Sequence, residues 1–308
     1  MSKETRKSTV QEPTIAKGRY RINAKLARCI LDWFEIAVLR HHYYSPVVFP
    51  KDLKRSLSEP RQLPGLDFNA DKQLELIKQF CYRDELLSIP LEPKELVFGY
   101  HNPFFGPGDA EMLYNMIRHF KPKRIVEIGC GQSTLVAILA QNRNQKDEPS
   151  YSCKHICVEP YEQPWLEKLG IQVIRECIER VDPSIIESLQ SNDILFIDSS
   201  HIIRPQGDVL HEYLFLLGLL RPGVIVHAHD IFTPRDYPAT WVLEERRLWN
   251  EQYLLEAFLS FNKSFEILVM TNYLFHEYLG ALENACPILV KELWREPGSF
   301  WFRRCLIA

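Results

Sequence analysis

Short apolar runs alternate with amphipathic stretches along the chain from residue 107 onward. Six runs have the length and content of buried strands, and the stretches between them repeat apolar residues at helical spacing. Strands are expected at 124–129, 154–159, 172–177, 193–198, 223–229 and 265–270. Helices are expected at 108–120, 132–142, 163–169, 207–219 and 241–261. Strands that alternate with helices predict an α/β fold with a mostly parallel sheet covered by helices on both faces.

The two ends of the chain follow different patterns. Toward the N-terminus, a helix is expected at 17–42, an irregular proline-rich connector at 45–70 and a short helix at 71–88. Toward the C-terminus, a helical pattern over 272–294 precedes a final apolar strand at 299–305. We predict three parts: a disordered lead at 1–16, a helical and irregular extension at 17–104 that forms a cover, and a sheet domain at 105–308.

The composition is that of an ordinary soluble chain: 308 residues, 46% hydrophobic, 25% charged, with formal net charge -3. This nearly balanced charge gives no electrostatic reason to expect nucleic acid or an anionic membrane as a partner. No run approaches the ~20 apolar residues needed to span a bilayer, and the N-terminus lacks the apolar core of a secretory signal. We therefore expect a cytoplasmic protein, with homo-oligomerisation left open.

Eight cysteines in a chain of this length do not form a disulfide framework. Cys130, Cys157 and Cys177 lie in or beside expected strands, where a free thiol packs as a small hydrophobe. Cys153 and Cys157 have a spacing that a metal ion can use, but no second Cys/His pair stands at zinc-site distance. Buried, reduced thiols are the favoured interpretation.

The segment RIVEIGCGQST, residues 124–134, is the most informative motif. An apolar strand containing Glu127 turns through Gly129 and Gly131 into a helix, which places glycines where a ligand must approach the backbone. The next strand ends in Glu159, where nucleotide-binding α/β folds carry an acid for ribose hydroxyls. The third glycine of the dinucleotide fingerprint is replaced by Thr134, which argues against NAD or FAD. The alternative is a tight turn with an incidental acid.

These residues resemble the E-x-G-x-G signature of the class I S-adenosylmethionine-dependent methyltransferases. The resemblance covers about residues 105–305, and the final strand fits the reversed strand that ends a methyltransferase sheet. It implies that Glu127, Gly129, Gly131 and Glu159 bind S-adenosylmethionine. The segment before the first helix, HNPFFGPGDAEM (101–112), often closes over the cofactor in this fold, which adds Asp109 as a cofactor residue.

Two further strands end in residues that can do chemistry, FIDSSH and HAHDIF. Ligands of an open α/β sheet lie at the carboxyl ends of its strands, so Asp198, His201, His229 and Asp230 are expected to cluster there. His229 and Asp230 can converge only if the chain leaves the sheet before Asp230, because side chains alternate along a strand. Structural alternatives are a capping role for Asp198, a turn role for His201 and packing within the sheet for His227.

This pattern resembles the small-molecule and sugar O-methyltransferases of the macrocin and cephalosporin type. Some members hold Mg²⁺ with the aspartate after strand four and an acidic pair after strand five. Here His229 replaces one of those acids, and Mg²⁺ has little use for imidazole. Either Asp198, His229 and Asp230 hold a softer divalent ion, or no metal binds and His201 or His229 is the base, with Asp198 as an orienting residue toward cofactor or histidine.

The resemblance implies methyl transfer to a hydroxyl of a small molecule or sugar. Tyr237, in a loop beside the expected site, and Asn102, ahead of the first sheet-side helix, are the candidate substrate residues. Two other functions stay open. One is methylation of nitrogen or carbon, although DSSH is not the N/D-P-P-Y/F tetrapeptide of many N-methyltransferases; the other is a catalytically silent scaffold.

Overall fold

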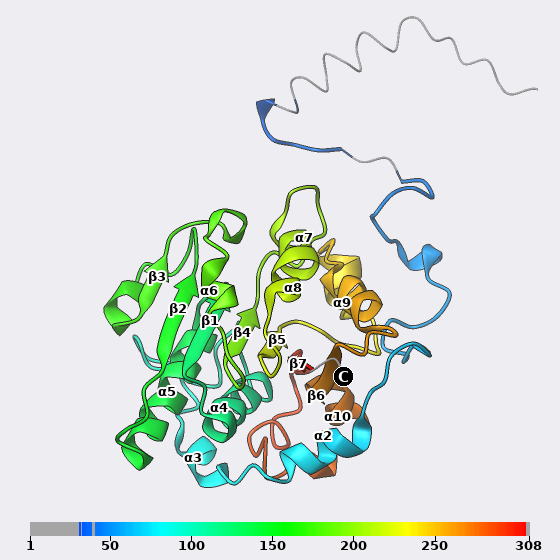
Figure 1. Ribbon diagram of the computed structural model, residues 1–308. Helices are drawn as coiled ribbons and strands as arrows, with labels where there is room; N and C mark the ends of the chain where they lie inside the picture. The colour runs from blue at the N-terminus through cyan, green and yellow to red at the C-terminus, as the bar shows by residue number, and fades with distance from the viewer. Residues whose placement is uncertain (1–30, 32, 39–40, 306–308) are drawn as a thin grey trace, which may run out of the picture. The chain divides into compact units, whose positions relative to one another are not determined.

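The computed structural model describes residue 31 and residues 33–38 and 41–305, which fall into two compact units, Met1–Val48 and Phe49–Ala308. The expected lead at 1–16 lies outside the described residues, and so does most of the helix expected at 17–42. The second unit contains the sheet and is described from here on (Figure 1).

A seven-stranded sheet in the order β3-β2-β1-β4-β5-β7-β6 forms the centre of this unit (Figure 1). Its strands are β1 (Arg124–Ile128), β2 (Lys154–Val158), β3 (Gln172–Ile174), β4 (Ile194–Ile197), β5 (Ile225–Ala228), β6 (Phe265–Met270) and β7 (Phe300–Arg304). Only β7, among the described strands, runs antiparallel to its neighbours, β5 and β6. The expected α/β fold with a reversed last strand is confirmed.

The main helices are α2 (Ala70–Ile77), α3 (Arg83–Ser88), α4 (Asp109–Phe120), α5 (Gln132–Asp147), α9 (Glu251–Leu259) and α10 (Thr271–Glu277). Shorter turns are α6 (Ser184–Glu187), η1 (Pro50–Asp52), η2 (Leu166–Leu169), η3 (Ile178–Arg180) and η6 (Leu279–Leu282). The helix expected at 207–219 consists of three consecutive segments: α7 (Asp208–His211), the π-helical η4 (Glu212–Leu216) and α8 (Leu217–Leu219).

The long helix expected at 241–261 is broken into the π-turn η5 (Thr240–Glu244) and α9. Arg246 between them is in the left-handed region, with φ 54°. The break brings Asn250 and Glu251 to the end of β4, where both backbone N–H groups donate to the carbonyl of His201. Tertiary hydrogen bonds thus override a helical pattern here.

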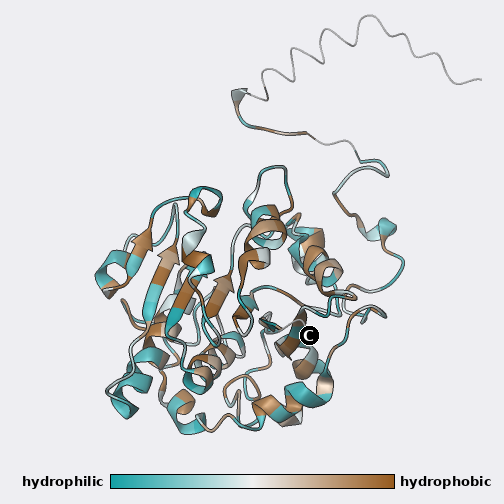
Figure 2. Ribbon diagram, in the orientation of Figure 1, coloured by the Kyte–Doolittle hydropathy of each residue, from teal (hydrophilic) through white to brown (hydrophobic). Residues whose placement is uncertain are grey.

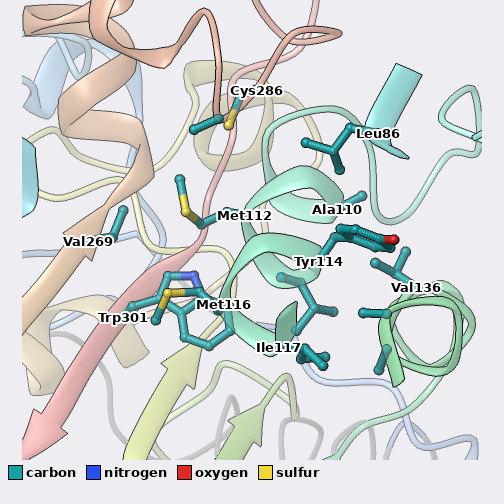
Figure 3. Close-up of a cluster of buried hydrophobic side chains, with 14 of the residues drawn as sticks. Leu86, Ala110, Met112, Tyr114, Met116, Ile117, Val136, Val269, Cys286 and Trp301 are labelled. Atoms are coloured by element: carbon teal, nitrogen blue, oxygen red, sulfur yellow. The ribbon is translucent and has the colours of Figure 1, made fainter. Parts of the chain in front are cut away.

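Strand alternation separates the core into two layers. Hydrophobic residues follow the strands of the sheet (Figure 2). One layer joins Ile125, Phe196 and Trp301 of the sheet to α4 and α5, and the other joins Val126, Leu195 and Phe302 to η4 and α9. Figure 3 shows α4 within the first layer, where Met116 lies beside Trp301. Ile117 of the same helix packs in this layer with Val136 of α5.

Residues that we assigned to an extension also supply this core. Side chains of Leu66, Ile77, Phe80, Leu86, Phe98 and Tyr100 are buried among those of the sheet domain. The compact unit therefore begins at Phe49 rather than at residue 105. Farther upstream, Arg61 pairs with Asp236 and Glu256, which joins the irregular segment before α2 to the segment after β5.

Candidate functional site

The turn from β1 into α5 is built around two glycines with different roles. Gly129 has φ 76°, and a Cβ there would lie 1.8 Å from the carbonyl oxygen of Asp198. Gly129 is therefore required for the end of β4 to pack against the turn. At Gly131 a Cβ would meet nothing closer than the Gln163 amide at 3.9 Å. The open side of the turn is at Gly131.

Glu159 follows β2 and ties the neighbouring loop to this turn. One carboxylate oxygen accepts hydrogen bonds from the backbone N–H groups of Tyr161 (3.0 Å) and Glu162 (2.9 Å), and the other accepts from that of Cys130 (3.2 Å). A carboxylate offers about four lone-pair directions, so acceptor capacity remains for a ligand hydroxyl. The predicted ribose acid lies beside the turn, as expected from its position after β2.

A cavity of about 90 Å³ opens at the carboxyl ends of β1, β2 and β4. Its walls include Gly129, Val158, Tyr161, Ile178, Ser199 and Arg204. Ligand pockets usually have ~300–1,000 Å³. A nucleoside would therefore require the side chains at its mouth, such as the exposed Tyr161, to move apart.

Glu127, the acid before the turn, does not face this cavity. Its carboxylate accepts hydrogen bonds from the hydroxyls of Ser133 and Thr134 and lies 2.9 Å from Nε2 of His155. With 1% of its surface exposed, it is enclosed between β1, β2 and α5. The prediction of a direct cofactor contact is corrected: Glu127 holds the start of α5, because a residue inside a strand faces the covering helix.

The four polar residues at the ends of β4 and β5 meet in one cluster. Oδ1 of Asp198 lies 3.2 Å from Nε2 of His201 and 3.3 Å from Nδ1 of His229. Oδ2 of Asp230 lies 3.7 Å from each of these nitrogens. β5 ends at Ala228 and Asp230 has φ 55°, so the chain leaves the sheet and lets His229 and Asp230 converge.

The carboxylates, not the imidazoles, line the open side of this cluster. The side chains of Asp198 and Asp230 are 28% and 15% exposed, whereas those of His201 and His229 are 6% and 3% exposed. Although burial opposes charge on both rings, Asp198 and Glu251 raise the pKa of His201 well above its ordinary value. Asp230 and Asp198 do the same to the pKa of His229. The neighbouring carboxylates thus favour the protonated form of both imidazoles.

The two carboxylates are pushed in opposite directions. Against the effect of burial, the neighbouring His229 and His201 cations hold the pKa of Asp198 below its usual range. Burial raises the pKa of Asp230. The histidine base therefore stays a prediction, and the more open carboxylate of Asp230 is a second candidate for accepting a proton.

Residues that the sequence did not single out support His201 from behind. Glu251, at the start of α9, places Oε2 2.7 Å from Nδ1 of His201, and Tyr213 of η4 donates to its Oε1 at 2.7 Å. Trp249 packs on the imidazole with ring centroids 4.2 Å apart. No fixed spacing links residues 201 and 251, so no sequence pattern indicates this contact.

Asp109 and Gly298 support the other side of the cluster. Oδ2 of Asp109 lies 3.5 Å from Nε2 of His229, and Oδ1 accepts the N–H of Gly298 at 2.8 Å. The carbonyl of Gly298 accepts from Ile231, and a Cβ on Gly298 would come within 2.9 Å of Cα of Asp230. Asp109 is 2% exposed, so the structure gives it a positioning role rather than the predicted cofactor contact.

Both predicted substrate residues are corrected. Asn102 is 2% exposed; its amide donates to the carbonyls of Gly99 and Phe105, and its oxygen accepts from Phe104 and Phe105. Its side chain folds its own loop. The Tyr237 hydroxyl is buried and accepts from the backbone of Gln252. A loop position in the sequence did not reveal that neighbouring segments cover both residues.

Comparisons with known proteins bear on this arrangement. Residues 126–231 match the family described as "Methyltransferase domain". An Archaeoglobus fulgidus protein, described as uncharacterized, is 27% identical over 168 residues, which are 50% of this chain and 74% of the relative.

Among the described residues, no helix has the length and apolar character that a membrane-spanning segment requires.

Two solved structures are similar at low identity. One is an O-methyltransferase from Bacillus cereus in complex with SAH, 13% identical with a TM-score of 0.37 over 77% of this chain and 91% of that one. The other is a putative methyltransferase from Thermobifida fusca, 14% identical with a TM-score of 0.36 over 81% and 96%.

The sheet order and the reversed β7 match a Rossmann-like methyltransferase fold, and the matched segment belongs to a family described as a methyltransferase domain. The matched segment runs from β1 to the residue after Asp230, so it contains the glycine turn, Glu159 and the strand-end cluster.

Proposed function

We propose that this protein transfers a methyl group from S-adenosylmethionine to a hydroxyl of a small molecule or sugar. The observation that carries the proposal is the convergence of Asp198, His201, His229 and Asp230 beside the Gly129–Gly131 turn. When bound, S-adenosylmethionine supplies an electrophilic methyl group. The chain's own task is to orient the acceptor and remove its proton.

Residues around the turn fit the cofactor. The open side at Gly131 allows close approach to the backbone, and Glu159 has acceptor capacity for ribose hydroxyls. Asp198, after β4, lies beside the same turn, because its backbone N–H donates to the carbonyl of Ile128 at 2.8 Å. The acceptor would therefore meet Asp198 and Asp230 first, since the histidines lie behind them.

Proton removal has two forms. In the first, the acceptor hydroxyl gives its proton to Asp230, while the cationic histidines stabilise the negative charge that develops on oxygen. In the second, Asp198, His201 and Asp230 would hold a divalent ion, since one ligand atom from each lies within 4.8 Å of the other two. An ion there would acidify a hydroxyl directly.

This ligand set differs from the predicted one, since His201 takes the place of His229. Its carboxylate, carboxylate and imidazole donors suit Fe²⁺, Mn²⁺ or Zn²⁺ better than Mg²⁺. Glu251 would then hold the opposite nitrogen of His201, the usual arrangement behind a metal-binding histidine.

The cofactor assignment is tested by calorimetric titration with S-adenosylhomocysteine. Gly131→Val should abolish binding and keep the fold, because its new side chain enters the open side of the turn. Gly280→Val is the matched control. A Cβ at Gly280 has no neighbour within 4 Å, and Gly280 belongs to η6, away from the turn. Wild-type affinity in Gly131→Val would remove the assignment.

Turnover is tested with labelled S-adenosylmethionine and a panel of phenols and sugars. Activity lost to EDTA and restored by Mn²⁺, Fe²⁺ or Zn²⁺ supports the metal form, whereas EDTA-insensitive turnover supports Asp230 as the base. Methylation confined to amines would replace the O-methyltransferase proposal. Cofactor binding without turnover across the panel would favour a silent scaffold.

A further inference from the structure

A second polar cluster lies inside the protein, away from the strand-end site. Glu127 of β1 is paired in register with Cys157 of β2, and His155 points to the same face two residues earlier. These three residues are 1%, 0% and 4% exposed. Helix α5 covers them, and two of its hydroxyls donate to Glu127.

The three ligand atoms form a compact triangle. Oε2 of Glu127 lies 2.9 Å from Nε2 of His155 and 3.6 Å from Sγ of Cys157, and the nitrogen and sulfur are 3.7 Å apart. Zn²⁺ bonds of ~2.0–2.3 Å at tetrahedral angles place such atoms ~3.3–3.6 Å apart. The geometry points to a binding site for a soft divalent cation of the Zn²⁺ class at Glu127, His155 and Cys157.

The donor types agree with this choice. A thiolate and an imidazole select Zn²⁺ or Co²⁺ over Mg²⁺ or Ca²⁺, which prefer oxygen ligands. The strand-end set of Asp198, His201 and Asp230 contains no sulfur. The two sites are therefore distinguishable by chemistry.

Neighbouring side chains complete the surroundings of an ion. Gln141 of α5 lies 3.1 Å from Nδ1 of His155, where a ligating histidine needs a partner for its other nitrogen. Ser133 occupies the second oxygen of Glu127. Cys130 packs in the same buried cluster as Cys157.

One ligand of the cluster borders a cavity at the amino ends of β2 and β3. This cavity of about 340 Å³ has His155, Gln141, Cys153 and Gly170 among its walls. His155 therefore lies between the cavity and the buried carboxylate of Glu127, on the side of the cluster away from the cofactor turn.

The donor charges match a divalent ion. One thiolate, one carboxylate and one neutral imidazole around Zn²⁺ form a neutral set, which avoids the cost of a net buried charge.

The ion would link β1 and β2 to the first turn of α5. Thr134, which donates to Glu127, also accepts the N–H of Gly131 at 3.1 Å. The site therefore lies directly behind the cofactor turn and would stabilise it. This role does not depend on methyl transfer.

Cobalt(II) titration of the full, chelator-treated chain tests the site, because a thiolate ligand produces a sulfur-to-cobalt charge-transfer absorption. The wild type should show this band and saturate with one ion per chain. Cys157→Ser should lose it. Cys153→Ser is the matched control, since Cys153 lies on the cavity wall outside the ligand set, and it should keep the band.

Circular dichroism establishes that each variant is folded. If Cys157→Ser does not fold, His155→Gln replaces it and should shift the band or weaken cobalt binding at least tenfold. An Asp198→Asn, Asp230→Asn double variant should keep the band, which separates this site from the strand-end set. No band in the wild type, or an unchanged band in folded Cys157→Ser, would overturn the inference. S-adenosylhomocysteine binding is measured separately, so a failed cobalt test leaves the proposed methyltransferase function standing.

Discussion

The strand-end cluster and the Glu127 cluster both pair carboxylates with histidines but differ in how open those groups are to a ligand. Asp198 and Asp230 follow their strands and remain partly open, with cationic histidines behind them. Glu127, His155 and Cys157 lie within their strands and are enclosed by α5. The difference is one of position: the residue after a strand can meet a ligand, whereas the residue inside it meets a helix.

The largest effect should follow from changing the open cluster. Asp198→Asn should reduce turnover roughly 10²–10⁴-fold, because the acceptor loses its contact with a charged carboxylate, while the fold is kept. Steady-state kinetics and thermal unfolding measure the two quantities. Asp71→Asn, on the exposed side of α2, is the control. Turnover within twofold of the wild type would contradict the placement of the chemistry at this cluster.

The two glycines of the turn offer a second comparison between an enclosed position, Gly129, and an open one, Gly131. Gly129→Ala should lower the free energy of unfolding by ~2–5 kcal/mol, since its Cβ meets the carbonyl of Asp198 and φ is positive. Gly131→Ala should change it by less than about 0.5 kcal/mol. Urea unfolding of both variants checks this, and equal losses would show that the two glycines are not distinct in role.

Another enclosed acid, Glu111, should make the free energy of unfolding depend on pH. Burial raises the pKa of Glu111 in α4 to about 7, despite hydrogen bonds from Gly108, Ile288 and Leu289. Because the folded pKa exceeds the unfolded one, this group's contribution to stability is greatest below about pH 4.5 and declines as pH rises through about 7. The decline should total ~2–4 kcal/mol.

Glu111→Gln tests that expectation through the difference in unfolding free energy between pH 5 and pH 8. The glutamine does not titrate, so its difference should be smaller than that of the wild type by most of this amount. The same pH difference in both proteins would mean that Glu111 is already ionised at pH 5.

The smallest expected effect belongs to Glu127 itself. Glu127→Gln, studied with a chelator present, should lower the free energy of unfolding by ~1–3 kcal/mol, because an amide cannot accept from Ser133, Thr134 and His155 together. Affinity for S-adenosylhomocysteine should fall less than in Glu159→Ala, for which ~1–3 kcal/mol is expected. A greater loss of affinity in Glu127→Gln would restore the direct contact first predicted. Glu75→Gln, exposed on α2, serves as control.

The sheet and its order of elements were predictable because buried strands carry apolar runs that do not depend on distant contacts. The motif residues were placed correctly along the chain, yet their orientation was not always predictable. Glu127 was read as a ligand residue although its place inside β1 directs it to α5. Asn102 and Tyr237 were misjudged because a loop pattern does not show which other segments cover it.

The supporting residues depended on contacts between segments far apart in the chain. Glu251 reaches His201 only because the helix expected at 241–261 breaks before it. The sequence also predicts a later start for the sheet domain, at residue 105. The buried side chains within 66–100 are separated by polar and turn residues that resemble a connector.

Gly298 has a consequence for the order of events in biosynthesis. Its backbone touches Asp109 at the start of α4 and the segment Asp230–Ile231 after β5, and it lies two residues before β7. A nascent chain can form β1 to β5 before this segment leaves the ribosome, but the strand-end cluster then lacks the contacts of Gly298 with Asp109 and Asp230. The cluster should thus reach its final geometry only after β7 docks.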